Sequence, residues 1–176
     1  MTQTTPTDSP FGDAIAVLNY ALTLEHLEAA FYRDGLAMFD TAAYEALGFQ
    51  AGVRDRIAII AGDEAQHVAF LTSGIQQAGG TPVAEGQYDF GYTDLASFLS
   101  TAAAIEATGV SAYQGAAPYL IDNDDLLTAA LTIHGVEARH AAYLNLIEGT
   151  SPFPDAVNPT LTYDEVVAIV TPFIAG

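Results

Sequence analysis

The sequence predicts an all-α fold, a four-helix bundle made of two helical hairpins joined by a long crossover. Three observations predict it. Apolar residues recur at helical spacing in four long segments, no segment shows the alternating pattern of a strand, and the stretch TPVAEGQYDFGY is rich in Gly and Pro. A chain of 176 residues with 51% hydrophobic residues is also long enough to bury the core of one such domain.

Each predicted helix has a local signal at one end. The four long helices are expected over residues 13–34, 51–78, 94–119 and 122–149, and a short one near 42–47. Asp13 is expected to cap the first helix, Gly79-Gly80 to end the second, Thr93 or Asp94 to begin the third, and the turn DNDD to cap the fourth. These signals indicate two hairpins of similar length.

The chain is expected to divide into three parts. Residues 1–12 form a flexible lead, residues 13–149 the bundle, and residues 150–176 a tail with four prolines. Within the tail, Thr162 and Glu165 have the spacing of a capping box, which opens a short terminal helix packed on the bundle.

The composition excludes several classes of protein. The chain has no cysteine, which rules out disulfides and thiolate metal sites. Twenty-two acidic residues against four arginines, with no lysine, give a formal charge of −18, so nucleic acid and anionic membranes are not expected partners. Because most of the acids are scattered, we interpret them as an adaptation to high salt, as in a halophile, rather than as cation ligands.

The same sequence predicts a protein without a membrane span. No run of about eighteen uncharged apolar residues is present. The first twelve residues also lack the basic region and apolar stretch of a secretory signal, so a cytoplasmic location is expected.

An internal repeat carries the chemistry. GDEAQHVAFL at residues 62–71 matches GVEARHAAYL at residues 135–144 in six of ten positions, and both contain E-x-x-H. Glu25 is followed by Tyr32 on the first predicted helix, and Glu106 by Tyr113 on the third, at the same seven-residue interval. The repeat indicates one hairpin used twice, related by an approximate two-fold axis.

The E-x-x-H spacing suits metal binding. Residues three apart on a helix share a face, so a carboxylate and an imidazole can reach one point from one helix. Divalent iron, manganese or zinc accepts this mixed oxygen and nitrogen set. The predicted ligands are Glu25, Glu64, His67, Glu106, Glu137 and His140. Four ionised carboxylates in a bundle interior need about four compensating positive charges, which two divalent ions supply.

For three kinds of residue near these ligands the sequence leaves alternative roles open. Glu28, one turn after Glu25, is an alternative to Glu25 as a ligand, or a carboxylate behind the ligands or at an entry channel. Tyr32 and Tyr113 are candidates to hydrogen-bond the bridging carboxylates, and buried core tyrosines are the alternative. His134 could be an extra ligand or a proton relay, but a histidine on the helix face without a role in the site is the favoured interpretation.

Gly62 and Gly135 precede the E-x-x-H glutamates by two residues, where glycine lowers helix propensity. Close approach of the helices around the site is the expected reason.

The chain resembles the ferritin-like superfamily of di-iron and di-manganese carboxylate bundles over residues 13–149. The segments LTLEHLEAAFY, VEARHAAYL and PFPDAVNPTLTYDEVVAIV are similar to the branch that includes desiccation-related proteins. The resemblance implies that Glu25 and Glu106 are terminal ligands and that Glu64 and Glu137 bridge the two metals. It also implies that His67 and His140 each bind one metal.

The resemblance also implies the activity. Oxidation of Fe(II) by O₂ or peroxide, as protection against iron or oxidative stress, is the favoured hypothesis. Peroxide disproportionation at a manganese pair is an alternative, although manganese catalases are generally larger. A non-catalytic stress or structural bundle is the third hypothesis. A homo-oligomer such as a dimer is compatible with the sequence. A 24-subunit cage like that of ferritin is not expected, because the sequence shows no full fifth helix.

Overall fold

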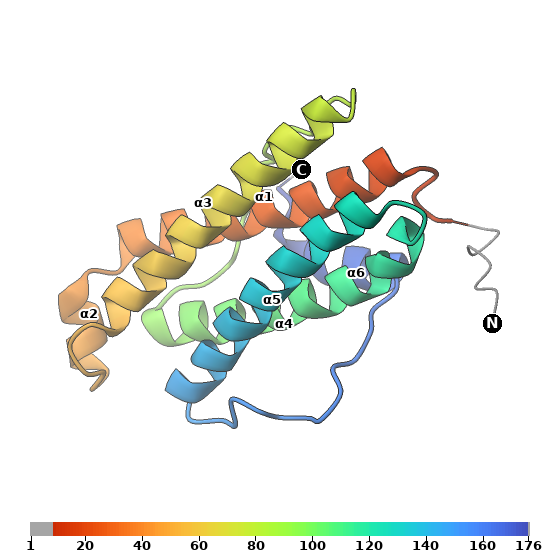
Figure 1. The fold of residues 1–176 in the computed structure, drawn as a ribbon. Helices are drawn as coiled ribbons and strands as arrows, with labels where there is room; N and C mark the ends of the chain where they lie inside the picture. The colour runs from red at the N-terminus through yellow and green to blue at the C-terminus, as the bar shows by residue number, and fades with distance from the viewer. Residues whose placement is uncertain (1–8, 176) are drawn as a thin grey trace.

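The computed structural model describes residues 9–175 and has the predicted all-α fold (Figure 1). Its four long helices are α1 (Ala14–Met38), α3 (Val53–Gln77), α4 (Leu95–Ala116) and α5 (Asp124–Ile147). Helix α1 packs mainly against α3, and α4 against α5, so the bundle consists of two hairpins. A smaller contact between α1 and α4 joins the hairpins, and the prediction of a four-helix bundle is confirmed.

Four shorter helices complete the described chain. They are α2 (Thr41–Ala46), the 3₁₀ helix η1 (Ala117–Leu120), α6 (Tyr163–Val170) and the 3₁₀ helix η2 (Thr171–Phe173). Most of the predicted N-terminal lead, residues 1–8, lies outside the described residues.

The helices begin at residues that the sequence marks. The Asp13 side chain accepts a hydrogen bond from the backbone N–H of Ala16, and Asp94 forms a capping box with Ser97. The predicted box of Thr162 and Glu165 is also present. After α3, Gly79 adopts a φ of 80°, which a residue with a side chain rarely adopts. Local capping therefore fixes most helix ends.

The predicted end of the first helix at residue 34 was wrong, because α1 continues through Gly35 to Met38. Gly35 is buried in the helix against the ring of Phe98 on α4. A Cβ atom at this position would collide with that ring. The glycine therefore permits close packing of α1 on α4 and does not end the helix.

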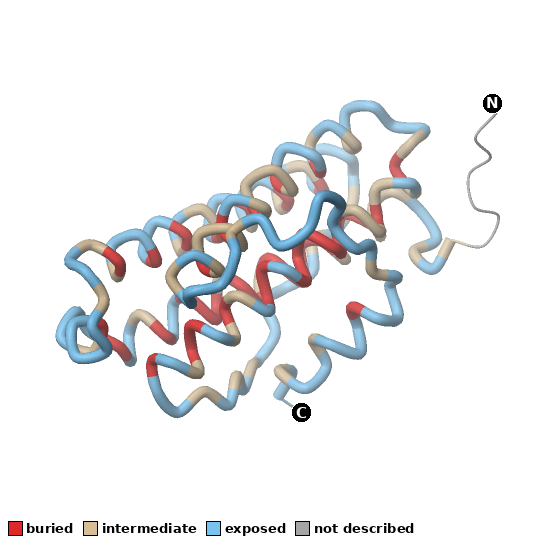
Figure 2. The backbone as a smooth tube through the Cα atoms, turned by 90° about the horizontal axis from the view of Figure 1, so that it is seen from below, coloured by how far each residue is buried: buried red, intermediate tan, exposed pale blue. Residues whose placement is uncertain are grey.

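Buried residues follow the inner faces of the long helices (Figure 2). Two large apolar clusters fill the two ends of the bundle. One is built around Phe31, Ile57 and Phe98, and the other around Leu22 and Ile75. The predicted ligands occupy the layer between these clusters, where water is largely excluded.

The crossover and the C-terminal segment cover the outer side of α1 and α4. Asn19 on α1 bonds the backbone of Thr81 and Val83, and an isolated antiparallel bridge joins Tyr88 to Ile174. Val166 of α6 is fully buried in a small cluster with residues of α1 and α4. Helix α6 otherwise exposes most of its length (Figure 2).

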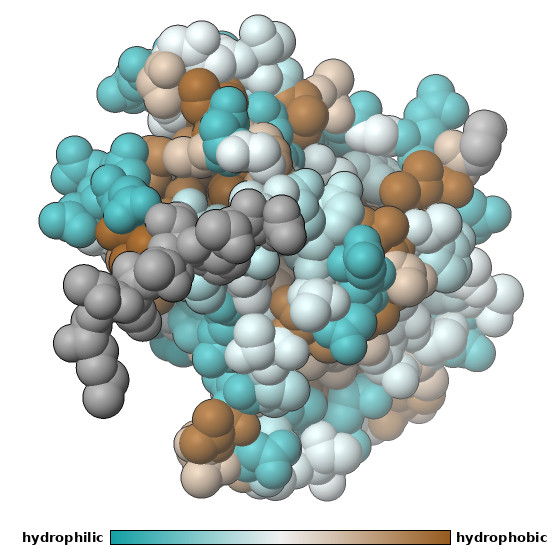
Figure 3. All heavy atoms as spheres, turned by 90° about the vertical axis from the view of Figure 1, so that its right-hand side faces the viewer, coloured by the Kyte–Doolittle hydropathy of each residue, from teal (hydrophilic) through white to brown (hydrophobic). Residues whose placement is uncertain are grey.

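The surface has no extended apolar face in the view of Figure 3, where hydrophobic residues lie in separate patches among hydrophilic ones. The segment Leu95–Leu120 is long and apolar enough, by length and composition alone, to cross a membrane. It contains α4, which packs against α1, α5 and α6 and carries the fully buried Glu106. These contacts are those of a core helix in the bundle.

Candidate metal centre

Six buried side chains from the four long helices meet in the polar layer of the bundle. They are the predicted set of Glu25, Glu64, His67, Glu106, Glu137 and His140. The four glutamates are 0% exposed, and the two histidines no more than 8%. Helix α1 supplies Glu25, α4 supplies Glu106, and α3 and α5 each supply an E-x-x-H pair.

The side chains form two overlapping groups of four. Glu25 and His67 belong to the first group, and Glu106 and His140 to the second. Within each group, one ligand atom from every residue lies within 4.8 Å of the others. Glu64 and Glu137 belong to both groups, so they lie where ligands shared by two metal ions would lie.

Both imidazoles point Nδ1 into the centre. His67 Nδ1 lies 3.1 Å from Glu25 Oε2 and 3.0 Å from Glu64 Oε2. His140 Nδ1 lies 2.8 Å from Glu64 Oε1 and 3.4 Å from Glu106 Oε2. The two histidines thus have the same role in each half of the repeat.

Several of these atoms lie close together but form no hydrogen bonds with one another. Among the described residues, His140 Nδ1, Glu64 Oε1, Glu106 Oε2 and both Glu137 oxygens are buried without a hydrogen-bond partner. His140 Nδ1 and Glu64 Oε1 are only 2.8 Å apart, but their orientation is not that of a hydrogen bond. Buried donors and acceptors that converge without pairing suit a cation between them, because unpaired burial is costly. The donor set therefore fits two divalent metal ions.

The charges of the layer depend strongly on one another. Burial raises the pKa values of Glu25 and Glu137 well above the ordinary range of a carboxyl group, and neighbouring carboxylates raise them further. Burial alone would also raise the pKa of Glu64, but contacts with His140 and His67 lower it to about 2. Conversely, burial alone would lower the pKa of His67, but the surrounding carboxylates raise it to about 12. In the absence of a cation, protons balance the charge of this layer.

Two tyrosines link the hairpins at the centre. The Tyr32 hydroxyl donates to Glu106 Oε1 at 2.5 Å, and the Tyr113 hydroxyl donates to Glu25 Oε1 at 2.5 Å. The expected contact with the bridging carboxylates was wrong, because each tyrosine reaches the glutamate of the opposite helix. Seven residues advance a helix by about 10 Å. On the antiparallel pair of α1 and α4, this step brings each tyrosine level with the other helix's glutamate.

Asp63 is a residue of the centre that the sequence analysis missed. Its Oδ2 lies 3.3 Å from His140 Nε2, the imidazole nitrogen that faces away from the carboxylates. A carboxylate at this position fixes the orientation of a metal-binding imidazole and increases its basicity. The equivalent residue in the second half is Val136. The repeat therefore gives no signal for Asp63, and only its contact with His140 across the bundle shows its role.

The remaining candidates lie outside the two groups. Glu28 is buried beside the centre. His134 lines a separate cavity of about 300 Å³ with Gln114 and Leu131, and burial lowers its pKa. The expected close approach at Gly62 and Gly135 was wrong, because a Cβ atom at either position would meet no atom within 4 Å. These two glycines lie on open sides of α3 and α5.

Comparisons with known proteins agree with this architecture. A solved structure described as "ferritin like, diiron-carboxylate proteins from Bacillus anthracis str. Ames" superposes with a TM-score of 0.64 at 19% sequence identity. The match covers 76% of this chain and 94% of that chain, and shows that the two share a fold. No curated protein matches the chain. The family described as "Ferritin-like domain" matches residues 13–150. Because this match spans most of the chain, the protein belongs to the family of ferritin-like domain proteins.

Proposed function

We propose that this protein holds two divalent metal ions and oxidises Fe(II) with O₂ or peroxide, which would protect the cell against iron and oxidative stress. The observation that carries the proposal is the pair of overlapping four-residue groups that share Glu64 and Glu137. Four buried carboxylates match two divalent cations in charge, and the convergent atoms without hydrogen-bond partners support a cation in each group.

The residues of the chain have distinct tasks in this proposal. Glu64 and Glu137 would hold both ions, while Glu25 with His67 and Glu106 with His140 would each complete one position. Tyr113 and Tyr32 hold the two terminal glutamates in place by hydrogen bonds. When bound, the metal pair supplies the one-electron redox chemistry that protein side chains lack.

The surroundings of the centre support a redox reaction. The apolar clusters on both sides exclude water from the ligands, so each ionic contact in the layer is stronger than it would be in solvent. The protons that the carboxylates and imidazoles hold without metal must leave when cations bind. The same groups can therefore take up or release protons when the charge of the metal pair changes.

The test is metal analysis of the natively purified protein, followed by oxygen measurement. We expect two ions per chain, mostly iron, and consumption of O₂ when Fe(II) is added to the metal-free protein. Oxygen release from peroxide by a manganese-loaded protein would favour the catalase-type alternative instead. Trace metal only, with no increase in melting temperature on adding Fe(II) or Mn(II), would leave the non-catalytic bundle.

A further inference from the structure

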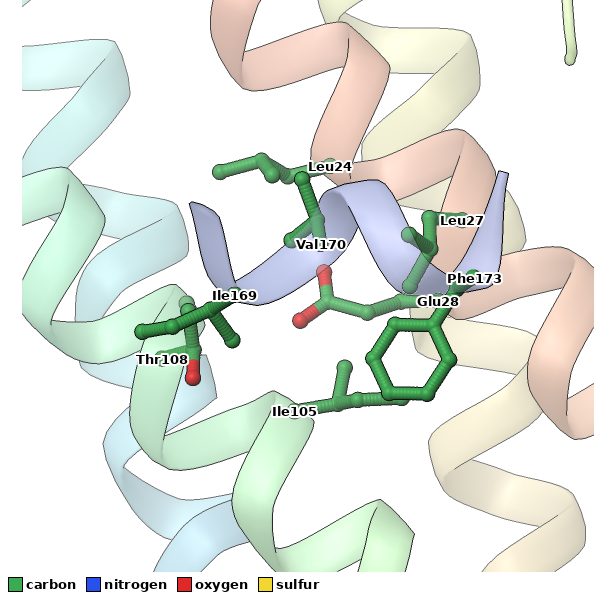
Figure 4. Close-up of a pocket in the computed structure, with 9 residues that line it drawn as sticks. Leu24, Leu27, Glu28, Ile105, Thr108, Ile169, Val170 and Phe173 are labelled. Carbon is green, nitrogen blue, oxygen red and sulfur yellow. The ribbon is translucent and has the colours of Figure 1, made fainter. Parts of the chain in front are cut away.

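Two cavities of very different size lie along α4. Figure 4 shows the smaller one, beside the metal centre, where the Glu28 carboxylate lies among mostly apolar side chains of α1, α4 and the C-terminal segment. At about 10 Å³ it has room for no more than about one water molecule. The larger one, of about 300 Å³, is formed by the end of α4, η1, the first half of α5 and the segment before α6. The proposed metal chemistry makes no use of this larger cavity.

Two buried polar atoms in the wall of the larger cavity have no hydrogen-bond partner among the described residues. They are Gln114 Oε1 of α4 and His134 Nε2 of α5. Outside the metal centre, the described chain leaves only two other buried side-chain atoms without a partner. These are the hydroxyl oxygens of Tyr44 and Tyr143, and neither residue lines this cavity. Because unpaired burial is costly, two such atoms in one cavity indicate a bound molecule that pairs with both.

The cavity favours an uncharged molecule. Among the described residues, no Asp, Glu or Arg lines it. Burial lowers the pKa of His134 below its ordinary value, so the imidazole is neutral at pH 7. A buried ion without a counter-ion is strongly unfavourable, and the formal charge of −18 adds to the repulsion of anions. A charged ligand therefore finds no partner of opposite charge in this wall.

The polar atoms and the rest of the wall specify the chemistry of the molecule further. Gln114 Oε1 only accepts hydrogen bonds, whereas the Nε2 of a neutral His134 donates when it carries the proton. A hydroxyl group satisfies both, because it donates one hydrogen bond and accepts another. Most of the remaining wall is apolar, with Ala117, Ala130 and Leu131. A cavity of about 150 Å³ holds benzene, so this one has room for a substituted ring.

We propose that this cavity binds a small uncharged phenol, a molecule with a hydroxyl group on a single apolar ring. The hydroxyl donates to Gln114 Oε1 and accepts from His134 Nε2, while the ring lies against the apolar wall. Leu131 and Thr160 line the cavity and are exposed, so the ligand enters between them. The inference goes beyond the proposed function and does not rest on it, because the cavity shares no residue with the two ligand groups.

Calorimetric titration of the natively purified protein with phenol, toluene and benzoate tests this inference. We expect saturable binding of one phenol per chain. Toluene has a similar size but no hydroxyl group, so it displaces water from the two polar atoms without replacing its hydrogen bonds. It should therefore bind at least about tenfold more weakly than phenol. Benzoate, which carries a negative charge, should show no binding.

Four variants separate recognition in the cavity from general effects. Gln114→Leu and His134→Leu should each weaken phenol binding about tenfold but not toluene binding, whereas a disturbed fold would weaken both. Ala117→Leu fills the cavity and should prevent binding of either compound. It also keeps the test available if the other two variants do not fold, which a melting curve would reveal. Gln76→Leu makes the same substitution at an exposed glutamine of α3 and should bind phenol like the wild-type protein.

The outcomes distinguish this inference from the proposed function. No saturable binding of phenol would overturn the inference and leave a cavity that holds only water. Equal affinities of the wild-type protein for phenol and toluene would also overturn it, because the two polar atoms would then recognise nothing. Unchanged phenol binding in Ala117→Leu would overturn it by placing phenol elsewhere on the molecule. A protein that binds phenol as expected but holds no metal would overturn the proposed function alone.

Discussion

Both metal positions of the proposed site depend on Glu137, since it belongs, like Glu64, to both groups and neither of its buried oxygens has a hydrogen-bond partner among the described residues. We expect Glu137→Ala to lose both ions and the Fe(II)-dependent consumption of O₂. Metal analysis after dialysis against the metal measures the loss, and the circular dichroism spectrum controls for folding. Two ions per chain in this variant would contradict the shared role of Glu137.

The two tyrosines at the centre should contribute equally to stability. Each donates one buried hydrogen bond to a glutamate of the other hairpin. Removing the hydroxyl leaves a buried carboxyl oxygen without its hydrogen bond, which costs about 1–3 kcal/mol, so Tyr32→Phe and Tyr113→Phe should each lower the free energy of unfolding of the metal-free protein by about this much. Urea denaturation measures the change. No loss in either variant would show that the two short contacts do not stabilise the fold.

The stability of the metal-free protein should fall as the pH rises from 5 to 8. Burial raises the pKa values of Glu25 and Glu137 above those in the unfolded chain, where carboxyl groups titrate near pH 4.3. Above that pH the unfolded chain releases protons that the folded chain keeps. Each such group then lowers the free energy of unfolding by up to about 1.4 kcal/mol per pH unit.

The histidines act in the same direction. The pKa of His67 is raised to about 12 and that of His140 to about 11, so their stabilisation is complete below pH 6.5 and declines as the pH rises above it. Urea denaturation at several pH values and constant ionic strength measures the slope. Saturating metal should flatten or reverse it, because cations replace the protons. A metal-free protein that becomes more stable from pH 5 to 8 would contradict this charge assignment.

At the scale of helices, replacing a glycine by alanine should raise the stability at some positions of the long helices and lower it at others. Gly62 on α3 and Gly135 on α5 face open space, so Gly62→Ala and Gly135→Ala should each raise the free energy of unfolding by about 0.5–1 kcal/mol through helix propensity. Thermal denaturation would show the gain. A loss of stability in both variants would mean that these helices make a contact in solution that the described chain does not contain.

Gly115 on α4 should behave in the opposite way. A Cβ atom there would overlap the backbone carbonyl oxygen of Leu161, in the segment that leads into α6. Because a backbone atom cannot move aside like a side chain, Gly115→Ala should cost about 1–3 kcal/mol and weaken the docking of α6. Faster hydrogen exchange in residues 161–173, with the long helices unchanged, would identify the cause. Unchanged exchange there would argue against this contact.

Helix ends and ligand spacing could be predicted because both are local. Asp13, Asp94 and the box of Thr162 and Glu165 signal their helices within four residues, and E-x-x-H sets two side chains on one face. The all-α class and the two hairpins could be predicted from the helical spacing of apolar residues and from the internal repeat. The four glutamates and two histidines of the predicted set also lie together in the structure.

Features that depend on contacts between helices could not be predicted in this way. Gly35 has the local appearance of a helix end, and only Phe98 on another helix explains why it lies inside α1. The partners of the tyrosines depend on the antiparallel stagger of α1 and α4. Asp63 contacts His140 across the bundle, and its repeat partner carries no carboxylate.

For the molecule as a whole, the formal charge of −18 should make stability depend on salt. Raising NaCl from 0.1 to 1 M shortens the Debye length from about 10 to 3 Å, which screens repulsion among the acidic residues. We expect a clear increase in melting temperature over this range. Sucrose, which strengthens burial without screening charge, is the control, and a similar gain from sucrose would contradict the electrostatic cause.

The reciprocal bonds from Tyr32 to Glu106 and from Tyr113 to Glu25 have a consequence for how the protein assembles. Each hairpin carries half of the donor residues and one tyrosine that hydrogen-bonds a glutamate of the other hairpin. Neither hairpin therefore contains the complete site. If the proposed site binds metal, metal binding and association of the two hairpins are therefore thermodynamically linked. If the chain were cut in the crossover, the two fragments would associate more tightly as the metal concentration increased, because the ions would bind only the associated fragments.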